Sequence, residues 1–191
     1  MKRELWYSAV VRDPNGKVIA RERRKSRSFL RQWNDIIRSQ VTGATGYIKR
    51  IDADVVKGIA PEGQNIKMTS AGGIETSQSI VVGSGDTAVT ISDYYVETVI
   101  AHGAGAGELN YQAATVNDSV VSAPNCGFVV ERAFINDSGG DVTVREMAIC
   151  VRMKGETYFG YACIARDVLG APQVIPNGGS LSTAYTLRVT A

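Results

Sequence analysis

Few side chains in this chain of 191 residues could take part in catalysis. Its single histidine, His102, begins the Gly-rich run 102–107. A histidine can act as a general base, but no serine or cysteine lies in the sequence context of a nucleophile elbow. The glycines follow a G-x-G-x-G pattern, which is neither the dinucleotide-binding fingerprint nor a Walker loop. We therefore expect His102 to be a turn or interface residue, and we expect no nucleotide site.

Acidic residues occur in pairs that could act as acid and base. Asp52 with Asp54, and Glu131 with Glu146, are such pairs, but this spacing is common on solvated strands. Glu146 is expected to be exposed or to form a salt bridge with a neighbouring arginine. The candidate arginines are Arg132, Arg145 and Arg152. We expect no enzymatic activity from these residues.

The three cysteines, Cys126, Cys150 and Cys163, are widely spaced and form no C-x-x-C pair. With a single histidine in the chain, this pattern does not suit a zinc site. Cys150 and Cys163 lie in apolar runs on either side of a turn, so a cross-strand disulfide stays open beside the interpretation that both are small buried hydrophobic residues. We expect no metal and no other cofactor.

Basic residues are concentrated in one short stretch. These residues are Arg21, Arg23, Arg24, Lys25, Arg27 and Arg31. They could contact a nucleic-acid backbone, dock on an acidic protein surface, or form a solvated basic face. Aromatic residues that could stack on bases are sparse here, because Phe29 and Trp33 fall on an apolar helix face. This favours an acidic protein partner over nucleic acid.

The charge of the whole chain is divided between its two ends. Residues 1–50 hold 13 Lys/Arg and four Asp/Glu, a balance of +9, whereas residues 51–191 hold eight and fifteen, a balance of −7. Such a dipolar chain can attract copies of itself head to tail. No apolar run approaches the roughly 18–20 residues of a membrane span, and the N-terminus does not have the pattern of a signal peptide. We expect synthesis in a cytoplasm.

Two elements are predicted to position the basic stretch. Residues 4–23 form a β-hairpin around the turn Asp13–Gly16. Residues 26–41 form an amphipathic α-helix, because apolar side chains recur there at helical spacing. These side chains are Phe29, Leu30, Trp33, Ile36, Ile37 and Val41. Together the hairpin and helix make a basic arm over residues 1–41.

The rest of the chain is predicted to be a loop-rich connecting segment, residues 42–79, followed by a β-body, residues 80–191. The predicted strands of the body are 109–122, 127–136, 141–153, 157–165 and 180–190, and the last is expected at a sheet edge. Strands at this spacing, joined by Gly/Asn turns, indicate a mainly β fold with an antiparallel β-sandwich or jelly-roll-like body.

Several runs in the second half of the chain combine glycine turns with strand-like stretches: Val82–Ala88, Ile100–Gly103, Asn136–Glu146, Ala165–Leu169 and Val174–Gly179. In their order and combination these runs resemble motifs of tailed-bacteriophage virion structural proteins. The family carries a G-x-G-x-T-A opening, a Gly-Gly turn leading into a strand with a glutamate, and a P-N-G-x-x-L-x-x-x-Y-x-L closing strand. The resemblance covers roughly residues 80–191 and, less closely, the basic front of the chain. It implies a component of the virus particle and carries no catalytic residues.

The sequence therefore leads to the expectation of a virion protein: a capsid-accessory (decoration), neck or tail component that forms homo-oligomers and docks on other virion proteins. Electrostatic contacts would come from the six basic residues, and apolar contacts from Trp33, Ile36 and Ile37. A receptor- or glycan-binding surface protein, contacting through Tyr94, Tyr95 and the 103–107 loop, stays open. So does a nucleic-acid-binding accessory protein that uses the basic arm.

Overall fold

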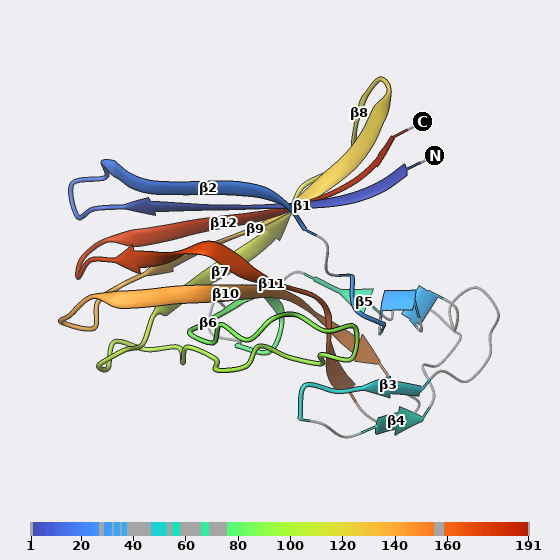
Figure 1. The fold of residues 1–191 in the computed structure, drawn as a ribbon, viewed down its shortest axis with the longest axis horizontal. Helices are drawn as coiled ribbons and strands as arrows, with labels where there is room; N and C mark the ends of the chain where they lie inside the picture. Colours follow the sequence, from blue (N-terminus) through green and yellow to red (C-terminus); the bar gives the residue numbers. More distant parts are fainter. Residues whose placement is uncertain are drawn as a thin grey trace.

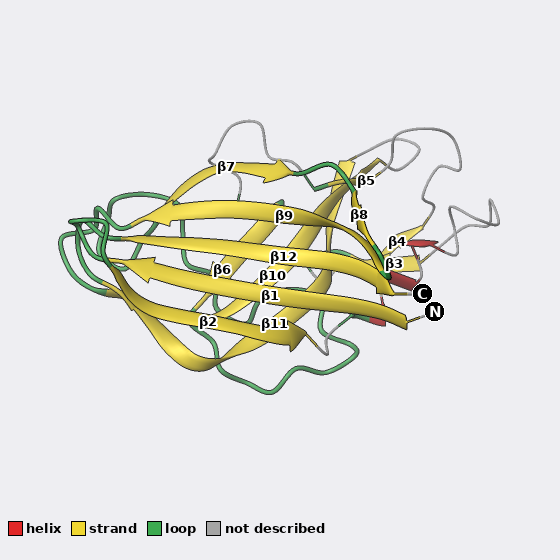
Figure 2. Cartoon of the chain, turned by 90° about the horizontal axis from the view of Figure 1, so that it is seen from above, coloured by secondary structure: helices red, strands yellow, loops and turns green. Residues whose placement is uncertain are grey.

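The computed structural model describes residues 2–26, 29–31, 33–34, 36–37, 47–52, 55–57, 66–68, 76–154 and 159–190. Over these residues the chain is mainly β, and the strands pair antiparallel. Two sheets face each other across a shared apolar core, which is a sandwich-like arrangement (Figures 1 and 2).

Sheet A holds the two ends of the described chain side by side. Its main path runs in the order β2 (Val18–Ser26), β1 (Lys2–Arg12), β12 (Ser180–Thr190), β9 (Asn125–Ile135) and β7 (Asn110–Val116), and β8 (Val120–Ser122) also pairs with β9. β1 pairs with β12 along its whole length, from Lys2 opposite Thr190 to Arg12 opposite Ser180.

Sheet B is built around one long strand. β10 (Val142–Lys154) pairs with β11 (Phe159–Ile175) on one side and with β6 (Ser79–Gly83) and β5 (Ile66–Lys67) on the other. A separate two-stranded sheet contains β3 (Tyr47–Lys49) and β4 (Val55–Lys57). Cys150 and Cys163 are cross-strand neighbours on β10 and β11, both fully buried and both free thiols.

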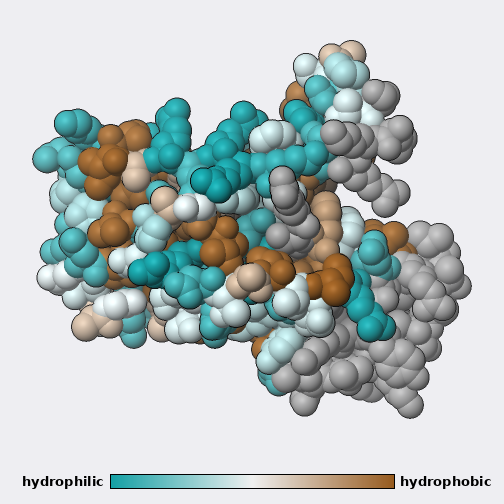
Figure 3. All heavy atoms as spheres, in the orientation of Figure 1, coloured by the Kyte–Doolittle hydropathy of each residue, from teal (hydrophilic) through white to brown (hydrophobic). Residues whose placement is uncertain are grey.

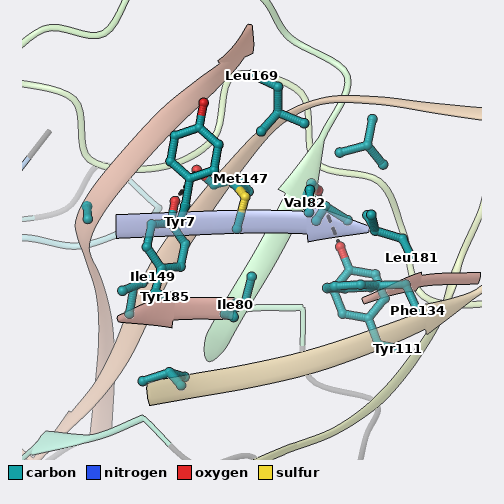
Figure 4. Packing of buried hydrophobic residues seen from close by; sticks show 14 of the residues in the cluster. Tyr7, Ile80, Val82, Tyr111, Phe134, Met147, Ile149, Leu169, Leu181 and Tyr185 are labelled. Carbon is teal, nitrogen blue, oxygen red and sulfur yellow. Dashed lines mark hydrogen bonds between the residues drawn. The ribbon is translucent and has the colours of Figure 1, made fainter. Parts of the chain in front are cut away.

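The main core lies between the two sheets. Alternation along β1 turns Leu5, Tyr7, Ala9 and Val11 inward. Figure 4 shows aromatic side chains from sheet A reaching toward sheet B. The Tyr185 hydroxyl donates to the Met147 carbonyl (3.1 Å) and the Tyr111 hydroxyl to that of Val82 (3.3 Å). These buried hydroxyls therefore pair with backbone acceptors while their rings fill the core.

A second, smaller core lies on the other face of sheet B. There Val81, Ala148, Cys150 and Cys163 pack under Leu30 and Val96. Residues 84–101, the first part of the chain between β6 and β7, provide much of this covering; we call them the cover segment. It is the green trace along the lower side of Figure 1. Sheet B is thus buried on both faces, which is why residues 147–151 are all buried and do not alternate.

Buried charged side chains connect the sheets at both edges of the sandwich. At one edge, the Glu22 carboxylate on β2 accepts the backbone N–H of Gly170 on β11 (2.8 Å). At the other edge, Arg132 on β9 donates to the carbonyls of Gln78 (2.9 Å) and Ile80 (3.1 Å). Glu22 therefore accepts a backbone N–H of β11, and Arg132 donates to backbone carbonyls at and beside β6. Without these side chains, the backbone groups at each sheet edge would be unpaired.

Three predictions need correction. The amphipathic helix predicted over residues 26–41 is not seen: Ser26 ends β2, Phe29 forms an isolated β-bridge to Ala165, and described helical backbone is confined to Arg31, Trp33, Asn34, Ile36 and Ile37. The remaining residues of that stretch after Ser26, apart from Leu30, lie outside the described residues.

The other two corrections concern sheet A. The predicted division into an arm (1–41), a connecting segment (42–79) and a body (80–191) does not match the strand pairing, because β1 and β2 belong to the body sheet. The last strand, predicted at an edge, lies between β1 and β9. The inward alternation of β1 agrees with the first result, since its apolar face is buried in the core of the sandwich; the second result follows from the non-local pairing of β12 with β1.

The turn predictions fare better. The hairpin predicted over residues 4–23 is confirmed as β1 and β2. The Asp13 carboxylate accepts the backbone N–H groups of Asn15 and Lys17, each at 2.9 Å, and Gly16 adopts a φ of 81°. His102, expected to be a turn or interface residue, forms an isolated β-bridge with Leu109, and its Nδ1 accepts the backbone N–H of Tyr111 (3.0 Å).

Candidate interaction site

The outer face of β2 presents a row of cations. The register pairs Arg21 with Val10, Arg23 with Ser8 and Lys25 with Trp6. Because Tyr7 and Ala9 point into the core, these alternate pairs point to solvent. We call Arg21, Arg23 and Lys25 the cationic strip. Hydrophilic residues gather on this upper side of the molecule in Figure 3.

The three members of the cationic strip differ in their partners. Lys25 forms an ion pair with Glu4 (2.8 Å), a carboxylate that also pairs with Arg188. The guanidinium of Arg23 lies over the Trp6 ring, 5.3 Å from its centroid. Within the described part of the chain, Arg21 and Arg23 have no carboxylate partner. Among the described residues, these two exposed positive charges therefore have no carboxylate to neutralise them.

Arg24 points to the other side of β2 and has a structural role. Its Nε donates to Glu22 (2.9 Å), while its side chain packs over Gly170 and stays 59% exposed. Glu22 also accepts the Tyr7 hydroxyl (2.7 Å). Burial, followed by this hydrogen bond, raises the pKa of Tyr7 well above its ordinary value. Arg24 thus belongs to the edge that connects β2 with β11.

The remaining predicted contact residues fall into three environments. Arg27 lies outside the described residues. Arg31 is exposed, and its backbone N–H donates to the Ile91 carbonyl (3.3 Å). Ile36 is fully buried in the main core, so it serves the packing of its own chain. Trp33 is half-buried and stacks on Phe29, and Ile37 is partly exposed.

Trp33 and Ile37 line an apolar groove beside the ends of β1 and β12. The groove has a volume of about 330 Å³. Its walls include Phe29, Phe128 and Leu187, and Glu4 and Arg188 also line it. The structure therefore brings two of the three predicted apolar residues close to the cationic strip, because Glu4 pairs with Lys25.

A network of buried charges lies at the opposite face, between sheet B and the cover segment. Glu146 on β10 is fully buried and accepts Arg166 Nε (2.7 Å). It also accepts the backbone N–H groups of Gly85, Glu97 and Thr98 at 3.0–3.1 Å. The buried carboxylate is thus fully hydrogen-bonded, as a buried charge must be.

Arg166 extends this network toward the surface. Its Nη1 pairs with Asp93 (2.7 Å), and its Nη2 donates to the Thr87 carbonyl (3.1 Å) and lies 3.8 Å from Glu97. Burial alone would lower the pKa of Arg166, but the hydrogen bonds to Glu146 and Asp93 raise it. The guanidinium therefore stays charged and holds the cover segment on the sheet.

Two carboxylates of the cover segment, Asp93 and Glu97, stay ionised as well. Burial alone would raise the pKa of Asp93, but hydrogen bonds from Thr90 and Arg166 lower it. Hydrogen bonds from Thr87 lower the pKa of Glu97. Around Arg166 there are thus three carboxylates and one guanidinium, so the network carries an excess of negative charge.

A pocket of about 490 Å³ opens beside this network. It is lined by Thr87, Ala88, Thr90, Asp93, Tyr94, Tyr95, Val96, Glu97, Ile51 and Arg166. We call it the acidic pocket. The loop 103–107, which the sequence grouped with Tyr94 and Tyr95, is not part of its lining.

The sequence analysis missed this network. It placed Glu146 on a solvated strand with Arg132, Arg145 or Arg152, whereas Glu146 is buried and pairs with Arg166. A partial signal was present: Glu146 directly precedes the apolar run 147–151, and Arg166 directly follows the apolar run 161–165, although each also has a charged neighbour, Arg145 or Asp167. Opposite charges on such strands indicate a buried pair.

The described residues contain no group of three or more His, Cys, Asp and Glu side chains arranged to hold a metal ion. Over the same residues, no helix is long and apolar enough to cross a membrane. Comparisons with protein-family models, with curated proteins and with solved structures found no match to this chain.

Proposed function

We propose that the chain is a structural component of a bacteriophage virion, a capsid-accessory, neck or tail protein that assembles with copies of itself and docks on other virion proteins. The cationic strip is the docking surface. The proposal includes a jelly-roll-like sandwich as the fold of the body and the virus particle as the location of the protein.

The observation that carries the proposal is the unpaired state of Arg21 and Arg23. Neither has a carboxylate partner within the described residues, although Lys25 on the same strand does. An exposed row of cations repels itself unless an anionic partner is present. Their arrangement at every second position of an edge strand gives a flat surface, which suits contact with another protein.

A second support comes from the residues that carry the virion-protein resemblance. Gly85 and Thr87 from the G-x-G-x-T-A run, Glu146 from the turn-strand run and Arg166 from the next run contact one another in the buried network. The matching motifs are thus the parts of one structural unit, which explains why they occur together.

The test is incorporation into particles. The double variant Arg21→Glu/Arg23→Glu should fold normally but fail to co-sediment with particles that lack the native protein. Lys17→Glu changes the charge of the adjacent exposed turn and should co-sediment like the native protein. Normal incorporation of the double variant would contradict the proposal.

Nucleic acid is the alternative outcome of the same test. If the strip binds DNA or RNA, affinity should fall steeply with added salt, by counterion release from the phosphates. Salt-dependent binding that the double variant loses, together with unchanged incorporation into particles, would favour the accessory nucleic-acid protein instead.

A further inference from the structure

The acidic pocket has the chemistry of a receptor for a cationic side chain. Asp93 and Glu97 are both ionised at neutral pH, and the charge of Arg166 is already matched by Glu146 at 2.7 Å. Glu97 is 45% exposed, so its carboxylate faces solvent at the pocket. Among the described residues at the pocket and its network, the carboxylates Asp93, Glu97 and Glu146 therefore outnumber the single guanidinium of Arg166.

The tyrosines narrow the class of ligand. Tyr94 and Tyr95 line the same pocket as the carboxylates. A guanidinium can stack on a tyrosine ring and donate two parallel hydrogen bonds to a carboxylate, whereas an ammonium offers a point charge. Arginine is thus the side chain that uses both kinds of lining residue.

We propose that the acidic pocket receives an arginine from the cationic strip of a second copy of this chain. The inference rests on the proposed function, because it names a partner for the same strip. Arg21 and Arg23 are the arginines of the strip, and both lack a carboxylate partner in the described residues. The described residues thus have an excess of positive charge on the exposed strand β2 and an excess of negative charge at the acidic pocket.

The two surfaces cannot meet within one molecule. The strip lies on the outer face of sheet A, whereas the pocket is lined mainly by the cover segment, with Arg166 of β11. Figures 1 and 2 show that sheet B lies between sheet A and the cover segment. A contact between different patches on two copies is heterologous, and it extends into a ring or a filament.

Two complementary variants give a decisive experiment. Arg21→Glu/Arg23→Glu removes the strip and leaves the pocket, and Glu97→Lys removes the pocket and leaves the strip. Each variant alone should stay monomeric in analytical ultracentrifugation under conditions where the native chain assembles. An equimolar mixture should form a one-to-one heterodimer and nothing larger, because only one intact pocket and one intact strip remain per pair.

Further measurements separate the inference from its rivals. Asp137→Asn, at an exposed turn, should leave assembly unchanged. Free arginine amide should compete for the pocket, and salt should weaken assembly, because exposed charges are screened beyond about 8–10 Å at physiological ionic strength. Both variants should keep the native melting temperature to within a few degrees, which excludes unfolding as the cause.

Three outcomes would overturn the inference. The first is a native chain that stays monomeric at low salt, and the second is a Glu97→Lys variant that assembles like the native chain. The third is an oligosaccharide that binds in a Glu97-dependent way while assembly is unaffected, which would make the pocket a glycan site. In each case the proposed function stands if the strip variant still fails to enter particles, so the two failures are distinguishable.

Discussion

Two arginines on edge strands, Arg166 on β11 and Arg23 on β2, have opposite surroundings. Arg166 is 3% exposed and contacts Glu146, Asp93 and the Thr87 carbonyl. Arg23 is exposed and its described contact is the face of Trp6. The first arginine holds a loop on its own sheet, and the second has charge to offer a partner. The burial of an arginine and the groups that it contacts, rather than its residue type, thus decide whether it stabilises the fold or is available to bind a partner.

The largest effect should come from breaking the buried pair. Arg166→Met leaves Glu146 buried with no counter-charge, and the loss of one partner of a buried pair costs about 3–5 kcal/mol. Urea unfolding should show this loss of unfolding free energy. Arg145→Met is the matched control, since Arg145 is exposed on the same sheet. A loss below about 1 kcal/mol for Arg166→Met would contradict the structural role of the network.

Crowding the same network should give a smaller loss. A Cβ at Gly83 would lie 2.5 Å from Glu146 Oε1 and 2.6 Å from the Thr98 carbonyl. Because one of these atoms is backbone, Gly83→Ala should destabilise the fold by about 1–3 kcal/mol, as overpacking does. Gly140→Ala meets nothing within 4 Å and should be close to neutral. Equal melting temperatures for both variants would show that the cover segment adapts.

The network should also make stability depend on pH. The folded-state pKa of Asp93 lies below its ordinary value of 3.8, so its contribution is present above that value and is lost as the pH falls through the folded pKa. The difference in unfolding free energy between the native chain and Asp93→Asn should therefore shrink below about pH 4. Thr90→Val removes a hydrogen bond to Asp93. The unfolding free energy of this variant should therefore fall less steeply at acid pH than that of the native chain. A constant difference from neutral pH to pH 3 would rule this contribution out.

The smallest effect on stability should come from the cationic strip. Arg21→Ser removes an exposed side chain without a described carboxylate partner, so the unfolding free energy should change by less than about 0.5 kcal/mol. Arg23→Ser also loses a cation–π contact worth about 0.5–1 kcal/mol at an exposed site. A loss of several kcal/mol of unfolding free energy for either variant would show that the strip stabilises the fold, as Arg166 does, and would contradict the difference between the two arginines.

Local signals in the sequence predicted the strands and turns of this fold. The hairpin turn at Asp13–Gly16 and the strand ending at Thr190 follow from turn chemistry and alternation. The position of β1 inside sheet A could not be predicted in this way, because pairing between residues 2–12 and 180–190 is non-local. The apolar run at 29–37 has helical spacing, yet Phe29 and Leu30 instead pair with β11.

The candidate site was predictable only in part. Arg21, Arg23 and Lys25 stand out by charge alone, and their exposure follows from the alternation of the strand. Ile36 was expected at a surface because helical periodicity gives a face without saying what covers it. The acidic pocket gave no local signal, because its carboxylates and tyrosines acquire a common environment only when Arg166 and the cover segment meet.

The central position of β12 has a consequence for synthesis of the chain. β12 pairs with both β1 and β9, so β1 has no partner on that side until residues 180–190 leave the ribosome. Until then the nascent chain exposes two unpaired strand edges, which are prone to aggregate. Completion of this sheet therefore waits until residues 180–190 have been made, and its non-local pairing makes that step slow.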